Sequence, residues 1–174
     1  NENETAEYCV SAIDHKGFES FTCEPMLVDN QQNTTLLQME NFASISNLPY
    51  TGFSESGFIE ISNDVNNYLT IEVDAPHDGK YLMDFRYSNG AGPWNTDNKC
   101  AIRSLYHGNK YIGTFVFPQR GSDEWSDWGF SNQLQADLKK GKNQLYLKFE
   151  PWNQNMNVMT NKAMLDFMRL IRLN

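Results

Sequence analysis

The chain has 174 residues, of which 40% are hydrophobic and 13% aromatic, which is enough to bury the core of one folded domain. Its formal net charge of −8 and its lack of a lysine or arginine cluster argue against a phosphate backbone as ligand, so we expect no nucleic-acid partner. No run approaches the roughly 20 apolar residues of a membrane span, so we expect a soluble chain without one.

The N-terminal segment 7–28 has the pattern of a β-hairpin. Its cysteines, Cys9 and Cys23, flank the turn-like sequence DHKG and could face each other across the hairpin. A disulfide there would contribute about 3 kcal/mol; the alternative is two separate, partly buried thiols. The polar stretch DNQQNT that follows, residues 29–34, is predicted to be a linker.

The rest of the sequence has β periodicity. In NYLTIEVDA, for example, Leu69, Ile71 and Val73 alternate with polar residues, as expected of a half-buried strand. Residues 80–89, 110–117, 143–150 and 163–173 alternate in the same way, separated by PHDGK, HGNK and KKGKN turns. Only NQLQADLKK, residues 132–140, offers a helical turn. We therefore predict an all-β chain folded as an antiparallel β-sandwich or jelly roll.

Asp166 is the most unusual charged residue, because it lies in the otherwise apolar segment AMLDFMRLIRL. A buried carboxylate needs a counter-ion or hydrogen-bond donors. Glu40 and Gln38 in LLQMENF would converge with it if the first and last strands of the domain are neighbours, and calcium accepts such oxygen ligands. The alternative is that arginines such as Arg169, or backbone amides, satisfy both carboxylates.

Three aromatic residues, Tyr50, Trp94 and Trp152, lie in polar loops rather than at strand positions. Aromatic rings stack on the C–H faces of sugars while amides bind the hydroxyl groups. Loop asparagines accompany these rings, among them Asn89, Asn95, Asn98, Asn153 and Asn161. This grouping favours a glycan site, although ordinary loop packing explains each aromatic residue equally well on its own.

Catalytic signatures are weak. The histidines His15, His77 and His107 lie in turn-like sequences without a nucleophile or an orienting partner nearby. The densest acidic group, in GSDEWSDWG, is typical of a solvated loop rather than of a glycosidase carboxylate pair. We therefore expect no enzymatic activity from this chain.

Several segments together resemble carbohydrate-binding modules of families 6 and 35. LQMENFA resembles the opening EAEN motif, VDAPHDGKYLMDFRYSNGAG the VPxAGxYxLxFRYANG block, and DEWSDWG the tryptophan pair. PYTGFSESGFIEI, LKKGKNQLYLKF and MLDFMRL resemble further motifs in the family order, over roughly residues 35–173. The resemblance implies a galactose-binding-like β-sandwich with a structural calcium and a loop-end glycan site.

The resemblance assigns roles residue by residue. Gln38, Glu40 and Asp166 match the calcium ligands, although Gln38 replaces a glutamate and removes one charge from the site. In the glycan site, Tyr50 matches the aromatic residue after the first strand and Asn89 the asparagine of YANG.

Other positions are matched less directly. Asn161 lies near a sugar-contacting asparagine, and Trp94 lies in the variable loop after YSNG, where it is the best candidate for a stacking platform. Asn98 and Trp152 are also predicted to bind glycan, but only because they are an asparagine and an aromatic residue in polar loops. Trp125 and Trp128 match a structural pair, for which we expect packing before ligand contact.

The N-terminal hairpin resembles the last strands of a fibronectin type III domain, through YCVSAIDHKGFESFTCEP. We therefore divide the chain into residues 1–30, a remnant of a preceding domain, and residues 31–174, the β-sandwich module. This division implies that the chain is part of a larger multimodular protein.

Taken together, these features predict a noncatalytic module that binds a polysaccharide or oligosaccharide and targets a covalently linked glycoside hydrolase or lyase to it. The resemblance implies an extracellular, periplasmic or cell-surface location in a bacterium. One alternative is a structural sandwich wedged between domains of a glycosidase, without glycan binding; a small glycosidase or lyase is a second. The predicted cofactor is calcium.

Overall fold

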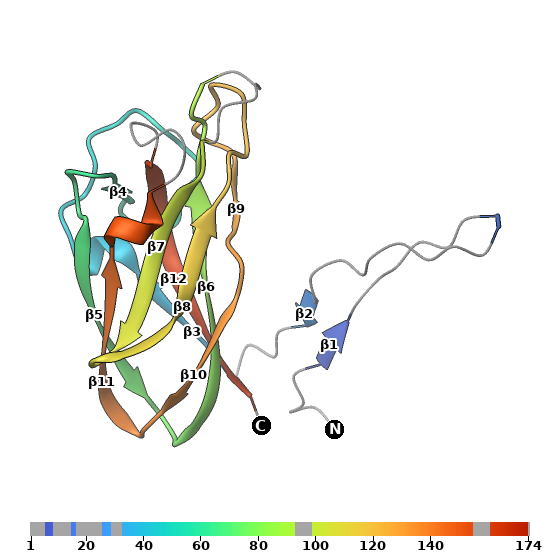
Figure 1. Ribbon diagram of the computed structural model, residues 1–174, viewed down its shortest axis with the longest axis vertical. Coiled ribbons are helices and arrows are strands. Elements are labelled where there is room, and N and C mark those ends of the chain that lie inside the picture. The colour runs from blue at the N-terminus through green and yellow to red at the C-terminus, as the bar shows by residue number, and fades with distance from the viewer. Residues whose placement is uncertain are drawn as a thin grey trace.

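The computed structural model describes residues 6–8, 15–16, 26–28, 33–92, 99–154 and 161–173. Within these residues two antiparallel sheets pack face to face as a β-sandwich (Figure 1). The all-β, antiparallel prediction is confirmed. In this part of the chain no helix combines the length and the apolar character that crossing a membrane requires.

The six-stranded sheet has β6 and β12 at its centre, with β10 beside β6 and β3 beside β12; β9 also pairs with β6, and β4 with β12. Its strands are β3 (Thr34–Gln38), β4 (Ile59–Ile61), β6 (Gly79–Ser88), β9 (Trp128–Phe130), β10 (Leu134–Leu138) and β12 (Ala163–Leu173). The first and last strands of the sandwich, β3 and β12, are therefore neighbours, as the metal-site prediction required, and Gln38 lies opposite Phe167.

The four-stranded sheet has the order β5-β11-β7-β8. Its strands are β5 (Tyr68–Ala75), β7 (Ala101–His107), β8 (Lys110–Phe117) and β11 (Gly141–Lys148). Single-turn 3-10 helices, η2 (Met39–Asn41) and η3 (Pro151–Asn153), follow β3 and β11.

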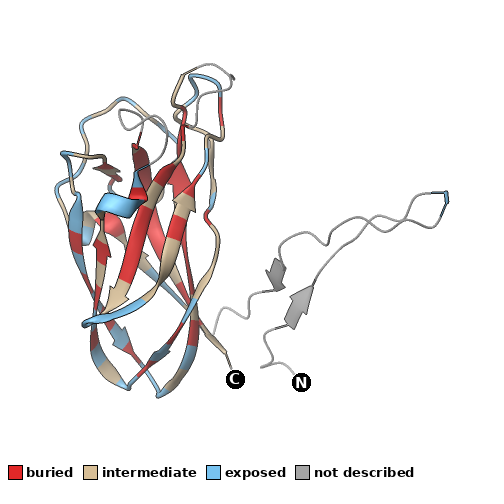
Figure 2. Ribbon diagram, in the orientation of Figure 1, coloured by how far each residue is buried: buried red, intermediate tan, exposed pale blue. Residues whose placement is uncertain are grey.

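The core lies between the sheets and follows the predicted alternation. Buried and exposed residues alternate strictly along β5 (Figure 2). In β6, Tyr81, Met83, Phe85 and Tyr87 are all buried, and the Phe85 ring meets Phe115 of the opposite sheet edge-on at 4.9 Å. Aromatic rings in this geometry contribute attraction beyond their buried area.

One secondary-structure prediction is wrong. The segment 132–140, expected to form a helical turn, contains strand β10, which pairs with β6. Leu134, Ala136 and Leu138 are spaced two apart, so a strand turns all three toward the core, whereas a helix would spread them around its axis. Ala136 and Leu138 are buried, and Leu134 packs against the core. Pairing with β6 decides the local conformation.

The N-terminal strands β1 (Ala6–Tyr8) and β2 (Met26–Val28) pair with each other, with Ala6 opposite Val28, and form a separate two-stranded sheet. This agrees with the predicted hairpin. Cys9, Cys23 and residues 29–32 lie outside the described residues, so the disulfide and the domain division stay predictions.

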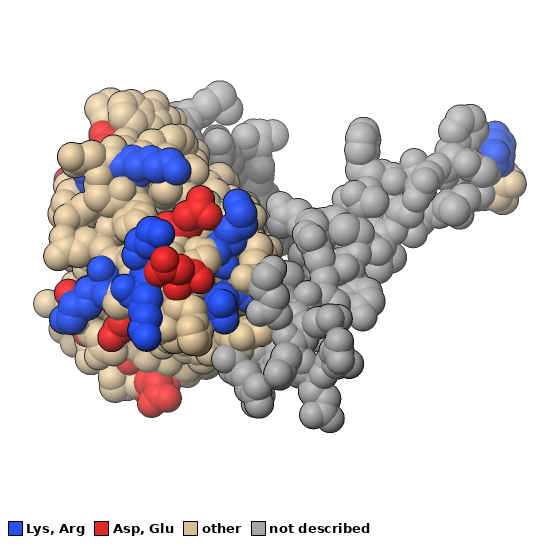
Figure 3. Space-filling model, turned by 90° about the horizontal axis from the view of Figure 1, so that it is seen from below, with Lys and Arg blue, Asp and Glu red and all other residues tan. Residues whose placement is uncertain are grey.

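The two ends of the sandwich differ. One end carries the β5–β6 and β10–β11 turns, and there basic and acidic side chains lie interspersed (Figure 3). Ion pairs at this end include Lys139 with Asp78 at 3.2 Å and Lys142 with Glu72 at 2.7 Å. The connections from β3 to β4 and from β8 to β9 lie at the other end, uppermost in Figure 1.

Candidate functional site

Two of the three predicted metal ligands, Gln38 and Asp166, meet at a loop serine on the outer side of β3 and β12. The Ser54 hydroxyl lies 3.0 Å from Gln38 Oε1 and 2.8 Å from Asp166 Oδ1, and the Ser54 amide donates to the same Asp166 oxygen at 2.9 Å. The convergence of Gln38 and Asp166 thus follows from the pairing of β3 with β12.

Asp166, which is fully buried, pairs with an arginine other than the one anticipated. Its second oxygen forms an ion pair with Arg86, whose guanidinium also donates to the Gly52 carbonyl at 3.0 Å and lies over the Trp128 ring. Arg169 instead binds Asp84, through bonds of 3.0 and 2.7 Å. The charge of Asp166 is therefore balanced within the protein.

Glu40 leaves a charge that the protein does not fully satisfy. One carboxylate oxygen accepts bonds from the Ser56 amide and hydroxyl at 3.2 and 2.9 Å. The other, Oε2, is buried without a hydrogen-bond partner among the described residues. A carboxylate, an amide and hydroxyl oxygens form a donor set that a hard cation accepts, and the orphaned Glu40 oxygen fits such an ion.

Within the described ranges, however, no three side chains of His, Cys, Asp or Glu meet at one point. A calcium ion here would therefore need amide, hydroxyl or backbone oxygens in addition to Glu40.

Tyr50 belongs to an aromatic cluster beside β6 and β9. Its ring stacks on Trp125 with centroids 5.6 Å apart and planes 12° from parallel, and on Phe58 at 5.9 Å. Trp128 meets Phe58 edge-on at 5.5 Å, and its indole donates to the Thr51 carbonyl at 2.7 Å. The tryptophan pair thus packs, as expected, and Tyr50 and Trp125 both remain partly exposed.

A lysine and a glutamate adjoin this cluster. The Lys162 ammonium lies 5.6 Å from the centroid of the Trp125 ring and 3.0 Å from the Glu60 carboxylate. Rings beside charged groups are the combination that sugar binding uses, because the rings stack on C–H faces and the charged groups bind hydroxyls.

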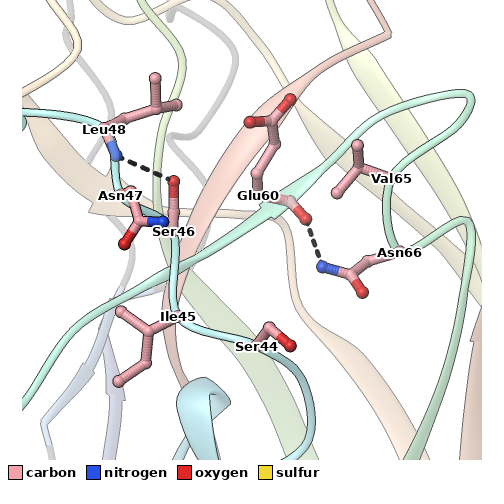
Figure 4. Close-up of a pocket in the computed structure, with 8 residues that line it drawn as sticks. All are labelled: Ser44, Ile45, Ser46, Asn47, Leu48, Glu60, Val65 and Asn66. Atoms are coloured by element: carbon pink, nitrogen blue, oxygen red, sulfur yellow. Dashed lines mark hydrogen bonds between the residues drawn. The ribbon is translucent and has the colours of Figure 1, made fainter.

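Glu60 also borders a shallow pocket of about 480 Å³. Figure 4 shows Glu60 between segment 44–48 and the loop residues Val65 and Asn66, where Asn66 donates to the Glu60 carbonyl at 2.7 Å. The lining residues are Ser44, Ile45, Ser46, Asn47, Leu48, Glu60, Val65 and Asn66. Sequence patterns did not point to Glu60, because it occupies an ordinary outward position between two buried isoleucines.

Asn89, predicted to contact sugar, is completely buried. Its amide donates to the carbonyls of Lys99 and Phe117 at 2.7 and 2.8 Å, and its side-chain oxygen accepts from the Ala91 amide at 3.2 Å. These bonds tie the end of β6 to the start of β7 and the end of β8. They give Asn89 a role in shaping the loops rather than an amide presented to solvent.

Asn161 is likewise buried and bonded within the protein. Its side-chain oxygen accepts from the Ile102 amide at 3.1 Å and from the Arg103 guanidinium, and its amide donates to the Asn153 carbonyl at 2.8 Å. Arg103 is fully buried and makes no ion pair with any described residue. Burial lowers the pKa of Arg103 to about 9, and carbonyl oxygens such as that of Ser62, at 2.8 Å, solvate its charge.

Trp152 lies apart from the aromatic cluster that contains Tyr50 and Trp125. Its side chain is 64% exposed, and its indole donates to the Ser104 hydroxyl of β7 at 3.1 Å, so it rests on the four-stranded sheet. Tyr50 and Trp125 lie beside the six-stranded sheet, and the described structure therefore does not bring Trp152 into their cluster. Trp94 and Asn98 lie outside the described residues, and their roles stay predictions.

Comparisons with known proteins agree with this architecture, although no sequence profile of a known family matches the chain. A cycloisomaltooligosaccharide glucanotransferase of Niallia circulans is 27% identical over 107 residues, which are 62% of this chain. The match covers 10% of that enzyme, so the chain spans about one tenth of the relative's length.

Solved structures match over most of the chain. The family 35 carbohydrate-binding module (CBM35) from Cellvibrio japonicus Abf62 superposes with a TM-score of 0.58 and 22% identity, covering 81% of this chain and 94% of that one. The cycloisomaltooligosaccharide glucanotransferase of Paenibacillus sp., complexed with cycloisomaltoheptaose, matches with a TM-score of 0.57 and 22% identity over 77% of this chain and 18% of that one. The chain thus has the antiparallel β-sandwich fold seen in family 35 carbohydrate-binding modules.

Proposed function

We propose that this chain is a noncatalytic carbohydrate-binding module that holds a covalently linked carbohydrate-active enzyme on its glycan. The observation that carries the proposal is the parallel Tyr50–Trp125 stack with Lys162 over the indole, next to the pocket bordered by Glu60. Binding there raises the concentration of glycan around the linked enzyme and needs no chemistry in the module itself.

The first ligands to test are α-1,6-linked gluco-oligosaccharides. Two matching relatives are cycloisomaltooligosaccharide glucanotransferases, a third is an isomaltosyltransferase, and one of the matching structures holds cycloisomaltoheptaose. A neutral oligosaccharide also suits a chain of net charge −8, which repels polyanions.

Calorimetric titration with isomalto-oligosaccharides tests the site. Replacing Trp125 by alanine removes the stacked indole, so we expect affinity to fall at least tenfold, and the Trp94→Ala variant tests the predicted platform in parallel. Phe130→Ala is the matched control, since Phe130 is 44% exposed in the six-stranded sheet and lies outside the cluster. Equal affinity of the wild type and both tryptophan variants, with unchanged melting temperatures, would refute the loop-end site.

The noncatalytic part of the proposal has its own test. The isolated chain should release no reducing sugar from any glycan that it binds. Turnover that disappears on replacing a single carboxylate would instead identify a small glycosidase. A folded chain that binds no glycan would favour the interdomain wedge.

We further propose that Glu40, with Gln38 and Asp166, binds a structural calcium ion. The buried, unpartnered Glu40 oxygen supports this role. When bound, the ion would supply positive charge to offset that carboxylate, so calcium should raise the wild-type melting temperature relative to chelator and should not raise that of Glu40→Gln. Identical melting curves with calcium and with chelator would mean that the two serines and Arg86 satisfy the carboxylates alone.

The proposed location is extracellular, periplasmic or on the cell surface, because a module of this kind acts where polysaccharide is found. Fractionation of cells that produce the parent protein, followed by detection with an antibody against this chain, checks that location.

A further inference from the structure

The outer face of the four-stranded sheet carries a row of tyrosines that the proposed loop-end site does not use. We call it the tyrosine face, and it consists of Tyr68 in β5, Tyr146 and Lys148 in β11, Tyr106 in β7, and Tyr111 in β8. Because the strand order is β5-β11-β7-β8, the row crosses the whole sheet. With strands about 4.8 Å apart, it extends about 14 Å.

Strand register places these side chains next to one another. Lys148 lies opposite Tyr68, Tyr146 opposite Tyr106, and Tyr106 opposite Tyr111. The Tyr68 and Tyr146 rings are 5.8 Å apart and tilted by 34°, and the Tyr106 and Tyr111 rings meet at 5.5 Å. The rings are therefore held in position without a ligand, which reduces the entropy lost on binding.

Lys148 lies at the centre of the row. Its ammonium is 4.7 Å from the Tyr106 ring centroid, 5.3 Å from that of Tyr68 and 5.5 Å from that of Tyr146. It forms no ion pair with any residue that the structure describes. Three rings thus fix a hydrogen-bond donor at the surface without a carboxylate to occupy it.

The aromatic residues are confined to one end of this sheet face. Further along β5 and β11 the outward positions carry ordinary polar residues, among them Glu72 and Lys142, which pair at 2.7 Å. The aromatic end is also the one on which Trp152 rests, because its partner Ser104 lies directly opposite Lys148 in the β7–β11 register. Such local concentration of exposed rings marks a binding surface rather than general sheet packing.

The chemistry of the face fits a neutral glycan. Tyr68 and Tyr111 are 51% and 50% exposed, so ring surface is available for stacking on sugar C–H faces. The Tyr106 phenol adds a hydroxyl group that is protonated at neutral pH, and burial and the neighbouring Glu150 carboxylate raise its pKa further. Lys148 and Glu150 bring opposite charges to the same region, while the chain as a whole carries −8 and would repel an acidic polymer.

A protein partner fits less well. Stable protein interfaces bury about 20 to 30 residues on each side, whereas this row is one or two side chains wide. A narrow row of rings flanked by hydroxyl and ammonium donors matches a polymer strand instead.

We propose that the tyrosine face is a second glycan-binding surface, on which a neutral polysaccharide chain lies across the strands, with Trp152 at its border. This inference rests on the proposed glycan-binding role and adds a contact surface separate from the Tyr50–Trp125 cluster.

Affinity electrophoresis in native gels tests the inference with dextran, xyloglucan and galactomannan as neutral probes and polygalacturonate as the acidic one. The test variant is Tyr68→Ala combined with Tyr111→Ala, which removes the two most exposed rings. We expect at least one neutral polysaccharide to retard the wild type and its apparent affinity to fall at least tenfold in the double variant. Phe130→Ala, an exposed ring of the other sheet, should behave as the wild type.

The outcomes separate this surface from the loop-end site. Amide shifts in an NMR titration with the retarding polysaccharide's oligosaccharide should include Tyr68, Tyr111 and Lys148 and should persist in Trp125→Ala. Binding that is lost in Trp125→Ala but unchanged in the double variant would overturn this inference and leave the proposed function intact. Retardation by polygalacturonate alone, or by none of the four polysaccharides, would also overturn it.

Discussion

The outer faces of the two sheets carry different kinds of side chain at their outward positions. On the six-stranded sheet, outward positions carry ion pairs, Arg86 with Asp166 and Arg169 with Asp84, and both carboxylates are almost completely buried. On the four-stranded sheet, outward positions carry tyrosines around Lys148, and two of the rings are half exposed.

The difference comes from what covers each face. Loop residues Gly52 and Ser54 lie over the six-stranded sheet, where the Gly52 carbonyl binds Arg86 and the Ser54 amide binds Asp166. A charge under such a cover must be paired, because water no longer solvates it. No equivalent cover is present over Tyr68 and Tyr111 in the described residues, and amphipathic rings tolerate that exposure. The covered ion pairs of the six-stranded sheet are therefore suited to stability, whereas the outer face of the four-stranded sheet leaves its rings accessible to a ligand.

The largest loss of stability is expected from breaking the ion pair under the loop that covers the six-stranded sheet. Asp166→Ala removes the partner of Arg86 and leaves its charge and the Ser54 donors unsatisfied, so we expect the free energy of unfolding to fall by about 3 to 5 kcal/mol. Urea denaturation measures it. In the control Asp137→Ala, an exposed carboxylate 3.8 Å from Lys80, the change should stay below about 0.5 kcal/mol. Equal losses of stability in Asp166→Ala and Asp137→Ala would show that covering an ion pair with a loop does not increase its contribution to stability.

An intermediate loss of stability is expected from removing a side chain that connects the two sheets. Asn161 precedes β12 of one sheet and binds Ile102 and Arg103 in β7 of the other. Asn161→Ala leaves these buried donors without their acceptor, which should cost about 2 to 3 kcal/mol by the same assay. Asn67→Ala, which removes an exposed bond to the Asn63 carbonyl, is the control and should cost about 0.5 kcal/mol. A smaller loss for Asn161 than for Asn67 would contradict the bridging role.

The smallest effect on stability is expected on the outer face of the four-stranded sheet. Lys148→Met keeps the aliphatic stem and removes the ammonium from three tyrosine rings, so the free energy of unfolding should fall by about 1 kcal/mol or less. Lys110→Met, at an exposed position, serves as the control. A loss above about 2 kcal/mol, measured by urea denaturation, would mean that Lys148 is primarily structural and would weaken the contrast between the faces.

The fold could be predicted largely from local patterns. Alternation in β5 and β6 identified the strands and the core residues correctly, because a strand buried on one side must alternate. The alternation of Leu134, Ala136 and Leu138 with polar residues in β10 was not recognised as a strand, because it covers only five residues. Phe149 continues the alternation of segment 143–150, which predicts a core position, but it lies just beyond β11 and is only partly buried, with Arg103 over its ring.

The candidate site was less predictable. The approach of Gln38 to Asp166 followed from the expectation that β3 and β12 are neighbours, but the choice of Arg86 over Arg169 depended on the irregular register of β12 between Leu165 and Phe167. Trp152 was grouped with Tyr50 because both lie in polar loops, yet it rests on the opposite sheet. Loop composition carries no information about which face a ring covers.

The sequence by itself determined the class of fold, the positions of most strands and the side chains that face the core, because periodicity and turn residues are local properties. Only the tertiary structure decided which polar groups are already satisfied and which remain available. Asn89 and Asn161 have their side-chain groups satisfied by buried hydrogen bonds, whereas five side chains from four different strands form the tyrosine face. These outcomes depend on strand order and register, which are set by contacts between segments far apart in the chain.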